Sequence, residues 1–394
     1  MIALTDDLVD LLLSERGRAA LAALGEADLS EGAELASLME LRRHFAPAEA
    51  AALLDQARLR QAARLKFPDA ERLFFTEEAL QQASSAQVAH YRAQYFRPYR
   101  RVADLGCGIG GDTLALAEVA PEVLAVERDP LRARLAVANV AARGLSARVT
   151  VLCADWTRLA LDVEAAFADP SRRVEGRRVF HLAQLEPPLE ALLALARRVP
   201  NVAIKAPPGL DDAEIPAEAE VEFISERGTL KEALLLFGDL RRGVPRSATL
   251  LPGPHRLEGP EPNLGVGVPG AFLYEPDPAV LRATLVRALG ARLGAWLIDP
   301  EIAYLTSDTL QETPFARAWR VLRHGPFGLK ALNRWLRELG AGAVVVKKRG
   351  SPIEPDAFVR RLKTLPGGAP LTVFLTRAGG RPWMLVAAEI TRQP

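Results

Sequence analysis

From Arg101 onward, short apolar runs alternate with stretches of helical periodicity, and this alternation restricts the folds available to the chain. Strands that are each followed by a helix are typical of a parallel sheet with crossover helices. Two further apolar runs flank Glu226-Arg-Gly-Thr, a turn short enough for an antiparallel hairpin. We therefore predict an α/β fold on an open, mostly parallel sheet. The expected strands are 102–105, 123–126, 149–152, 165–168, 202–204, 221–225 and 232–237.

Different patterns flank this predicted sheet. Apolar residues at helical spacing predict helices over 46–65 and 77–95, with Pro47 and Thr76 as helix-start residues. A Pro/Gly-rich stretch then predicts a linker before a separate α+β module. In that module we expect helices over 279–293 and 328–339 and strands over 343–347, 371–376 and 383–388. The predicted segments are a helical region (1–98), the sheet domain (99–250), a linker (251–270) and the C-terminal module (271–394).

The first predicted strand runs into a glycine-rich turn, Val102-Ala-Asp-Leu-Gly-Cys-Gly-Ile-Gly-Gly-Asp-Thr. Glycines let the backbone pass close to a ligand, and a helix N-terminus beyond them offers free amides. The spacing also satisfies the dinucleotide pattern G-x-G-x-x-G, with Glu127 about 20 residues further on. Asp104 argues against a dinucleotide, because its carboxylate would lie where the pyrophosphate of a dinucleotide must bind. It suits the ammonium group of S-adenosylmethionine instead.

Acidic residues end the first three strands of the predicted sheet, where an open α/β sheet binds its ligand. Glu127 can accept both ribose hydroxyls, and Asp155 can accept the adenine amino group with Trp156 beside the ring. The alternative interpretation is that these acids are ordinary helix caps and turns.

Over residues 70–250 the chain resembles the class I S-adenosylmethionine-dependent methyltransferases. Phe74-Phe-Thr-Glu-Glu-Ala-Leu is similar to the segment that precedes the glycine loop in the trimethylguanosine-synthase-like branch of RNA methyltransferases. The stretch from Phe327-Gly-Leu-Lys to Val345-Val-Lys-Lys-Arg-Gly resembles the THUMP-like domain of some bacterial methyltransferases. The resemblance implies a Rossmann-like class I sheet and S-adenosylmethionine as cofactor. The implied cofactor-binding residues are Thr76, Asp104, Gly106, Cys107, Gly108, Gly110, Asp112, Glu127, Arg128, Asp155 and Trp156.

The fourth strand ends in Asp169-Pro-Ser-Arg, where the family has Asp/Asn-Pro-Pro-aromatic. Asp169 and Pro170 match, whereas Ser171 replaces a proline and Arg172 replaces the aromatic residue. In the family the acid or amide holds the target amine and the ring stacks on the base. We expect Asp169 and Arg172 to be catalytic, since an arginine plane can also stack on a base. The alternative is a turn with an ion pair between Asp169 and a following arginine.

Cysteines and histidines exclude other chemistries. Methylation of pyrimidine C5 needs a thiolate from the fourth strand end onward, and no cysteine follows Cys153. The five histidines show no metal-ligand spacing, so we expect no metal. No apolar stretch of about 18 residues exists to span a membrane. Acids in the N-terminal segment argue against a secretory signal, so the expected location is cytoplasmic.

Charge is divided unevenly along the chain. From Arg241 to Pro394 there are 22 basic and 12 acidic residues, a net charge of +10, and the preceding part has a net charge of −9. Between Arg317 and Lys363 there are 12 basic and 3 acidic residues, a density that favours a polyanionic partner over a merely solvated basic face. We expect Lys347, Lys348 and Arg349 to form a phosphate-binding patch on one exposed turn. Lys205, after the fifth strand, is a further phosphate candidate, or else a surface lysine on a loop.

The sequence thus predicts a methyltransferase that acts on RNA, tRNA or rRNA, at a purine nitrogen, with guanine as the leading base. One alternative is a small-molecule methyltransferase. A second is a non-catalytic protein that binds S-adenosylmethionine and RNA, which the departures at Ser171 and Arg172 permit. The oligomeric state is left open.

Overall fold

The computed structural model describes residues 3–30, 32–171, 173–174, 177–178 and 185–391. The chain forms two compact units. The first contains residues 1–220 and 233–243, and the second contains residues 221–232 and 244–394. The finer division into four segments remains a prediction.

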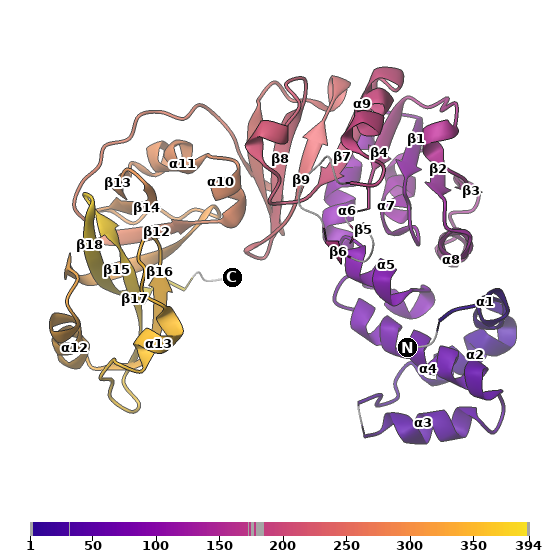
Figure 1. The fold of residues 1–394 in the computed structure, drawn as a ribbon, viewed down its shortest axis with the longest axis horizontal. Helices are drawn as coiled ribbons and strands as arrows, with labels where there is room; N and C mark the ends of the chain where they lie inside the picture. The colour runs from indigo at the N-terminus through magenta and orange to yellow at the C-terminus, as the bar shows by residue number, and fades with distance from the viewer. Residues whose placement is uncertain (1–2, 31, 172, 175–176, 179–184, 392–394) are drawn as a thin grey trace. The chain divides into compact units, whose positions relative to one another are not determined.

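Short helices around α4 form the beginning of the first unit (Figure 1). Pro47 occupies the first turn of α4, and the Glu49 carboxylate accepts a hydrogen bond from the Ala46 amide at 2.8 Å. The helix expected over 77–95 is interrupted at Ala83–Ser85, because the Ser85 hydroxyl caps a new helix by accepting from the Val88 amide. The helices are α1 (Asp6–Leu13), α2 (Glu15–Ala23), α3 (Glu34–Leu41), α4 (Pro47–Ala63), α5 (Glu77–Gln82) and α6 (Ala86–Ala93).

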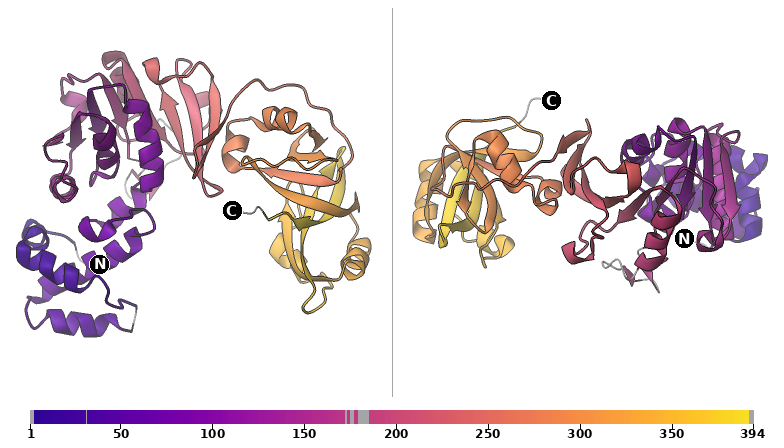
Figure 2. Two further views of the ribbon diagram at one scale, coloured as in Figure 1. Left: turned by 180° about the vertical axis from the view of Figure 1, so that it is seen from behind. Right: turned by 90° about the horizontal axis from the view of Figure 1, so that it is seen from above.

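The larger sheet has nine strands in the order β11-β10-β8-β9-β7-β4-β1-β2-β3. Strands β3, β2, β1, β4 and β7 are parallel, and β9 pairs antiparallel with β7. Helices lie on both faces of the parallel part (Figure 2), so β4 and β7 are buried along their whole length. The strands are β1 (Arg101–Leu105), β2 (Glu122–Glu127), β3 (Val149–Cys153), β4 (Ala165–Ala168), β7 (Asn201–Ala206), β8 (Glu220–Glu226), β9 (Thr229–Leu236), β10 (Arg246–Leu251) and β11 (His255–Leu257); the helices are α7 (Gly111–Val119), α8 (Pro130–Ala142) and α9 (Leu189–Arg198).

This strand order is that of the class I methyltransferase sheet implied by the resemblance, with two strands added at one edge. The hairpin predicted at Glu226-Arg-Gly-Thr joins β8 to β9, and its central residues Arg227 (φ 50°) and Gly228 (φ 75°) both adopt the left-handed conformation that such tight turns require. The segment expected to begin the linker contains the last residue of β10 and all of β11, and these two strands pair antiparallel. A short pair of strands, β5 (Arg173–Val174) and β6 (Arg177–Arg178), follows β4.

The second unit contains a seven-stranded sheet in the order β13-β14-β12-β15-β18-β17-β16. Leu332 and Leu336 of α12 pack into its core with Met384, and the half-buried Trp335 packs against the same cluster. The helix expected over 279–293 is two helices, because Thr284 adopts a left-handed φ of 59° between them. The elements are β12 (Phe272–Pro276), β13 (Trp296–Asp299), β14 (Ile302–Ser307), β15 (Ala316–Pro326), β16 (Ala341–Lys348), β17 (Ala369–Ala378), β18 (Arg381–Glu389), α10 (Pro278–Arg282), α11 (Val286–Leu293), α12 (Leu329–Glu338) and α13 (Pro355–Val359).

The described residues contain no candidate membrane span and no candidate metal centre. None of their helices is both long enough and apolar enough to cross a membrane. Within the same residues, no group of three or more His, Cys, Asp or Glu side chains is placed to hold a metal ion.

Candidate active site

A pocket of about 650 Å³ lies in the first unit at the carboxyl ends of the parallel strands. Its volume is within the range of small-molecule and cofactor sites. The loops after β1, β2, β3 and β4 all contribute to its wall, and β7 contributes Lys205. The sequence-predicted residues that line it are Gly106, Cys107, Gly108, Asp112, Glu127, Arg128, Asp155, Trp156, Asp169 and Lys205.

The glycine loop after β1 lies close to the strand end of β4. Gly106 has a φ of +81°, and a Cβ at this position would lie 2.9 Å from the backbone oxygen of Asp169. Any other residue would therefore strain the backbone and push the two segments apart. Gly110 has a φ of +88° and begins α7, whose free N-terminal amides follow.

Glu127 and Asp155 are positioned by hydrogen bonds at the ends of β2 and β3. Glu127 is buried, and its carboxylate accepts from the amides of Gly108 at 2.8 Å and Asp129 at 2.9 Å. Asp155 accepts from the hydroxyl and the amide of Thr157, and these bonds lower the pKa of its carboxyl. Asp155 is therefore an anion at neutral pH. Trp156 is buried beside it.

The two cysteines differ in environment. Cys107 is buried within the glycine loop, and burial raises the pKa of its thiol well above the usual range. Cys153 is exposed at the end of β3, next to the loop that carries Asp155.

Asp104, the last but one residue of β1, is completely buried. The Thr113 hydroxyl donates to its Oδ2 atom. Its Oδ1 atom has no hydrogen-bond partner among the described residues. Burial is the largest cause of a raised pKa of the Asp104 carboxyl; Asp112 and Asp169 also raise this pKa, the Thr113 hydrogen bond and Arg92 lower it, and the net value is about 8. An unpartnered buried oxygen is costly, so this site favours a ligand that brings a donor or a positive charge.

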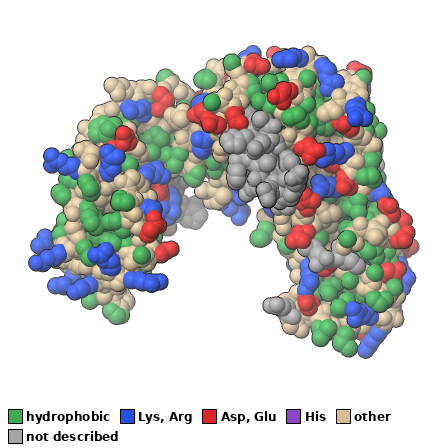
Figure 3. Space-filling model, viewed as in Figure 1, with side chains coloured by type: hydrophobic (Ala, Val, Ile, Leu, Met, Phe, Trp, Pro, Cys, Tyr) green, Lys and Arg blue, Asp and Glu red, His purple; other side chains and the backbone are tan. Residues whose placement is uncertain are grey.

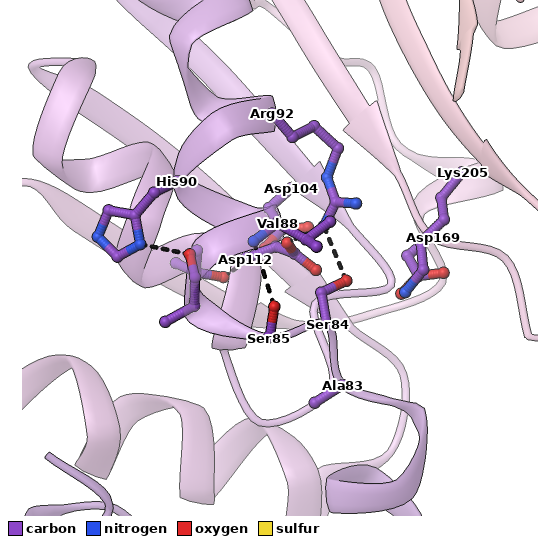
Figure 4. Close-up of polar contacts among 12 residues, drawn as sticks. Ala83, Ser84, Ser85, Val88, His90, Arg92, Asp104, Asp112, Asp169 and Lys205 are labelled. Atoms are coloured by element: carbon purple, nitrogen blue, oxygen red, sulfur yellow. Dashed lines mark hydrogen bonds and ion pairs between the residues drawn. The ribbon is translucent and has the colours of Figure 1, made fainter. Parts of the chain in front are cut away.

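Sequence analysis missed Arg92, a buried cation of α6 (Figure 4). Its guanidinium forms an ion pair with Asp112 and donates to the Ser84 hydroxyl at 3.0 Å. The same group lies over the Phe167 ring, 4.4 Å from the centroid, so it ties α6 to α7 and β4. Helical periodicity could have identified this residue, because Arg92 lies on the same buried face of α6 as Val88, Ala89 and Ala93.

Asp169 and Lys205 form an ion pair in the pocket, with 2.7 Å between Lys205 Nζ and Asp169 Oδ2 (Figure 4). Only 4% of the Lys205 side chain is exposed, and the residue belongs to strand β7. The alternative of a surface lysine on a loop is therefore wrong, because β7 is buried on both faces. Ser171 exchanges backbone hydrogen bonds with Glu186, which also forms an ion pair with Arg128 at 2.6 Å. Arg172 lies outside the described residues.

The segment before α5 is connected to the glycine loop by Asn139 of α8, which sequence analysis also missed. The Thr76 hydroxyl caps α5, whose first turn places Glu78 and Ala79 on the pocket wall. The buried Asn139 amide donates to the carbonyls of Phe74 at 3.0 Å and Ile109 at 2.9 Å, and its oxygen accepts from the Phe74 amide at 2.7 Å.

The expected patch of Lys347, Lys348 and Arg349 is not a single exposed turn. Lys347 and Lys348 are consecutive residues of β16, so their side chains point to opposite faces. Lys347 forms an ion pair with Glu275, and Lys348 with Glu354. The Arg349 guanidinium donates to the Ala303 carbonyl at 2.8 Å and lies over the Tyr304 ring. All three charges are thus engaged within their own unit.

Family models match three parts of the chain. The model described as RNA cap guanine-N2 methyltransferase matches residues 99–185, and the model described as THUMP domain-like matches residues 316–389. A domain of unknown function matches residues 6–63.

Over 324 residues the chain is 40% identical to an uncharacterized S-adenosylmethionine-dependent methyltransferase of Mycobacterium tuberculosis, in strains CDC 1551 / Oshkosh and ATCC 25618 / H37Rv. The match covers 81% of this chain and 88% of the relative. The chain belongs to the S-adenosylmethionine-dependent methyltransferases. A candidate methyltransferase from Porphyromonas gingivalis W83 has a crystal structure that matches 99% of this methyltransferase and 100% of its own chain, with a TM-score of 0.77 and 20% identity. That likeness shows a shared fold.

The pocket of this methyltransferase fits its cofactor, S-adenosylmethionine. Asp104 is not part of the pocket wall, but it comes two residues before Gly106, which is, and its buried Oδ1 atom has no partner among the described residues. An ammonium group that reached this atom would satisfy it. Glu127 and Asp155 offer carboxylates at the next two strand ends, as ribose hydroxyls and an adenine amino group require.

We predict that Asp104→Asn stabilises the cofactor-free methyltransferase at neutral pH. The folded protein holds a proton on Asp104 up to about pH 8, whereas the unfolded chain releases it at about pH 4. The stability from this group is complete below about pH 4 and is lost as the pH rises toward 8. The variant keeps the acceptor for Thr113, so its melting temperature should exceed that of the native protein more at pH 7.5 than at pH 5. A gain that is equal at both pH values would contradict this account.

The same substitution should weaken cofactor binding, because an ammonium group beside Asp104 would favour loss of its proton, whereas an amide cannot become an anion. We expect a loss of at least about tenfold, the scale of one charged hydrogen bond, in calorimetric titrations with S-adenosylhomocysteine. Asp162→Asn, at an exposed acid outside the pocket wall, is the matched control and should bind normally.

Asn139→Ala should destabilise the methyltransferase by about 2–3 kcal/mol, because it leaves the buried backbone groups of Phe74 and Ile109 without their partner. Urea denaturation measures this free energy, and Asn263→Ala, at an exposed asparagine, should change it by less than about 0.5 kcal/mol. Equal effects of the two substitutions would show that Asn139 does not connect these segments.

Proposed function

We propose that this methyltransferase methylates an RNA, either tRNA or rRNA, at a purine nitrogen, with guanine as the leading base. The observation that carries the proposal is the Asp169–Lys205 ion pair at the end of the pocket opposite the strand ends of β2 and β3. The match of residues 99–185 to the guanine-N2 methyltransferase model supports the base, and the THUMP domain-like match supports RNA as the substrate class. A cytoplasmic location stays a prediction.

The bound cofactor supplies an electrophilic methyl group, and the residues of this chain align the acceptor with it. Lys205 holds Asp169 Oδ2 at 2.7 Å, so the carboxylate has a fixed orientation with Oδ1 as a second acceptor. An exocyclic amine can donate to Oδ1 and to the Asp169 backbone oxygen, which lies against Gly106. Both contacts point the nitrogen lone pair in one direction, toward the cofactor side of the pocket.

The roles of the residues at this acceptor end of the pocket are also proposed. We assign Asp169 to the acceptor amine, and Arg172, from its position in the sequence, to stacking on the base. Lys205 is reassigned from phosphate binding to holding Asp169, because its ammonium group is buried. The cofactor residues proposed are those that the sequence predicted around Asp104, Glu127 and Asp155.

Asp169→Ala should reduce turnover by at least about 30-fold, equivalent to about 2 kcal/mol of transition-state stabilisation, and leave cofactor affinity within a few-fold. Asp169→Asn should keep much of the activity, since an amide oxygen also accepts from an amine. Because the alanine variant leaves Lys205 buried without its partner, Asp169→Ala/Lys205→Met is the control. Recovery of activity in the double variant would mean that the loss came from the unpaired lysine and not from the acceptor contact.

The substrate itself is tested by transfer of labelled methyl groups to fractionated cellular RNA, followed by nucleoside analysis. The expected product is a methylated guanosine, formed by the native protein and lost in Asp169→Ala. Methylation of small molecules only would favour a small-molecule methyltransferase, and RNA binding without any transfer would favour a non-catalytic protein.

A further inference from the structure

The surplus positive charge of the C-terminal module is concentrated on a surface other than the one expected from the sequence. From Phe327 to Lys363 there are nine basic and three acidic residues. Lys347, Lys348 and Arg349 are engaged with neighbouring groups. The other six cations are exposed, on α12 and on the segment from 360 to 363.

Three of these six follow one face of α12. Leu332 and Leu336 face the core, whereas Lys330, Arg334 and Arg337 are exposed. Spacings of four and three residues keep the three on one side of the helix, along about 10 Å of its axis.

The remaining three, Arg360, Arg361 and Lys363, are held beside this face by Asn333, and Leu362 between them packs against the same core cluster as α12. The buried Asn333 side chain donates to the Arg361 carbonyl at 3.2 Å and accepts from the Lys363 amide at 2.8 Å. Two segments that are about 30 residues apart in the sequence therefore lie side by side. We call the six residues the α12 surface: Lys330, Arg334, Arg337, Arg360, Arg361 and Lys363.

Acidic residues do little to neutralise the α12 surface. Glu338 is 3.8 Å from Arg334, both are exposed, and such pairs are weak. Glu354 is already paired with Lys348, and Asp356 is the other acid of this stretch. Figure 3 shows Lys and Arg side chains gathered on the lobe that carries α12 and α13. Nearby, the Phe327 side chain is 37% exposed and its ring lies 6.0 Å from that of Phe358.

We propose that the α12 surface binds the phosphate backbone of RNA. Its charge is complementary to a polyanion, its two groups of cations lie side by side, and a partly exposed aromatic side chain nearby suits an unstacked base. Contacts of this kind add affinity without reading sequence. The proposal deepens the proposed function, because its ligand is the RNA on which that function rests.

The test measures binding of a fluorescently labelled RNA hairpin with single-stranded flanks, without cofactor, over a series of salt concentrations. One variant changes Lys330, Arg334 and Arg337 to Gln, and another changes Arg360, Arg361 and Lys363 to Gln. The control changes Arg42, Arg97 and Arg197, three exposed arginines of the other unit, to Gln. Each test variant should reduce the slope of log affinity against log salt by about 2, at roughly 0.7 per lost contact, and the control should not. Tryptophan fluorescence reports that the substituted unit is folded, because Trp296, Trp319 and Trp383 belong to it.

An unchanged salt slope in both test variants, or an equal loss in the control, would overturn the proposal. Displacement of the RNA by polyglutamate at equal charge concentration would also overturn it, because the surface would then fit an acidic protein as well. Methyl transfer is measured separately on the same RNA fractions. RNA binding without methyl transfer by the native protein would support the α12 surface and overturn the proposed function. Normal methyl transfer by both test variants would support the proposed function and overturn the α12 surface.

Discussion

Parallel pairing of β3, β2, β1, β4 and β7 is the constraint on which the site depends. It places the ends of all five strands at one edge of the sheet, so residues far apart in the sequence meet in one pocket. At that edge Gly106 has room for no side chain against the Asp169 carbonyl, so the glycine loop and the end of β4 are fixed relative to each other. The parallel sheet thereby sets the positions of these two segments before any ligand binds.

The strand ends could be read from the sequence because the relevant information is local. A short apolar run followed by glycine or an acid marks a strand and its carboxyl end, and Asp104, Glu127 and Asp155 all follow this pattern. Arg92 and Asn139 could not be found in this way. Their importance lies in contacts with Asp112, Phe74 and Ile109, which come from other elements and become neighbours only in the folded chain.

In the C-terminal module, a strand and the exposure of the charged residues could not be predicted from the sequence. Strand β15 was not predicted because its sequence, ARAWRVLRHGP, carries charged residues at most of its exposed positions, and its alternation of buried and exposed residues is irregular around a bulge. Charge density alone correctly located a basic region, but it could not separate Lys347, which is paired with Glu275, from the exposed Lys330. That distinction depends on which acid each cation meets across the sheet.

The contrast between the two cysteines gives this methyltransferase a natural labelling position. Cys107 is buried with a raised thiol pKa, so it is a poor nucleophile, whereas Cys153 is exposed. A maleimide dye would therefore attach at Cys153, two residues before Asp155 and without any engineered cysteine. A fluorophore there would stand beside the part of the pocket wall formed by Asp155 and Trp156 and convert ligand arrival into an optical signal.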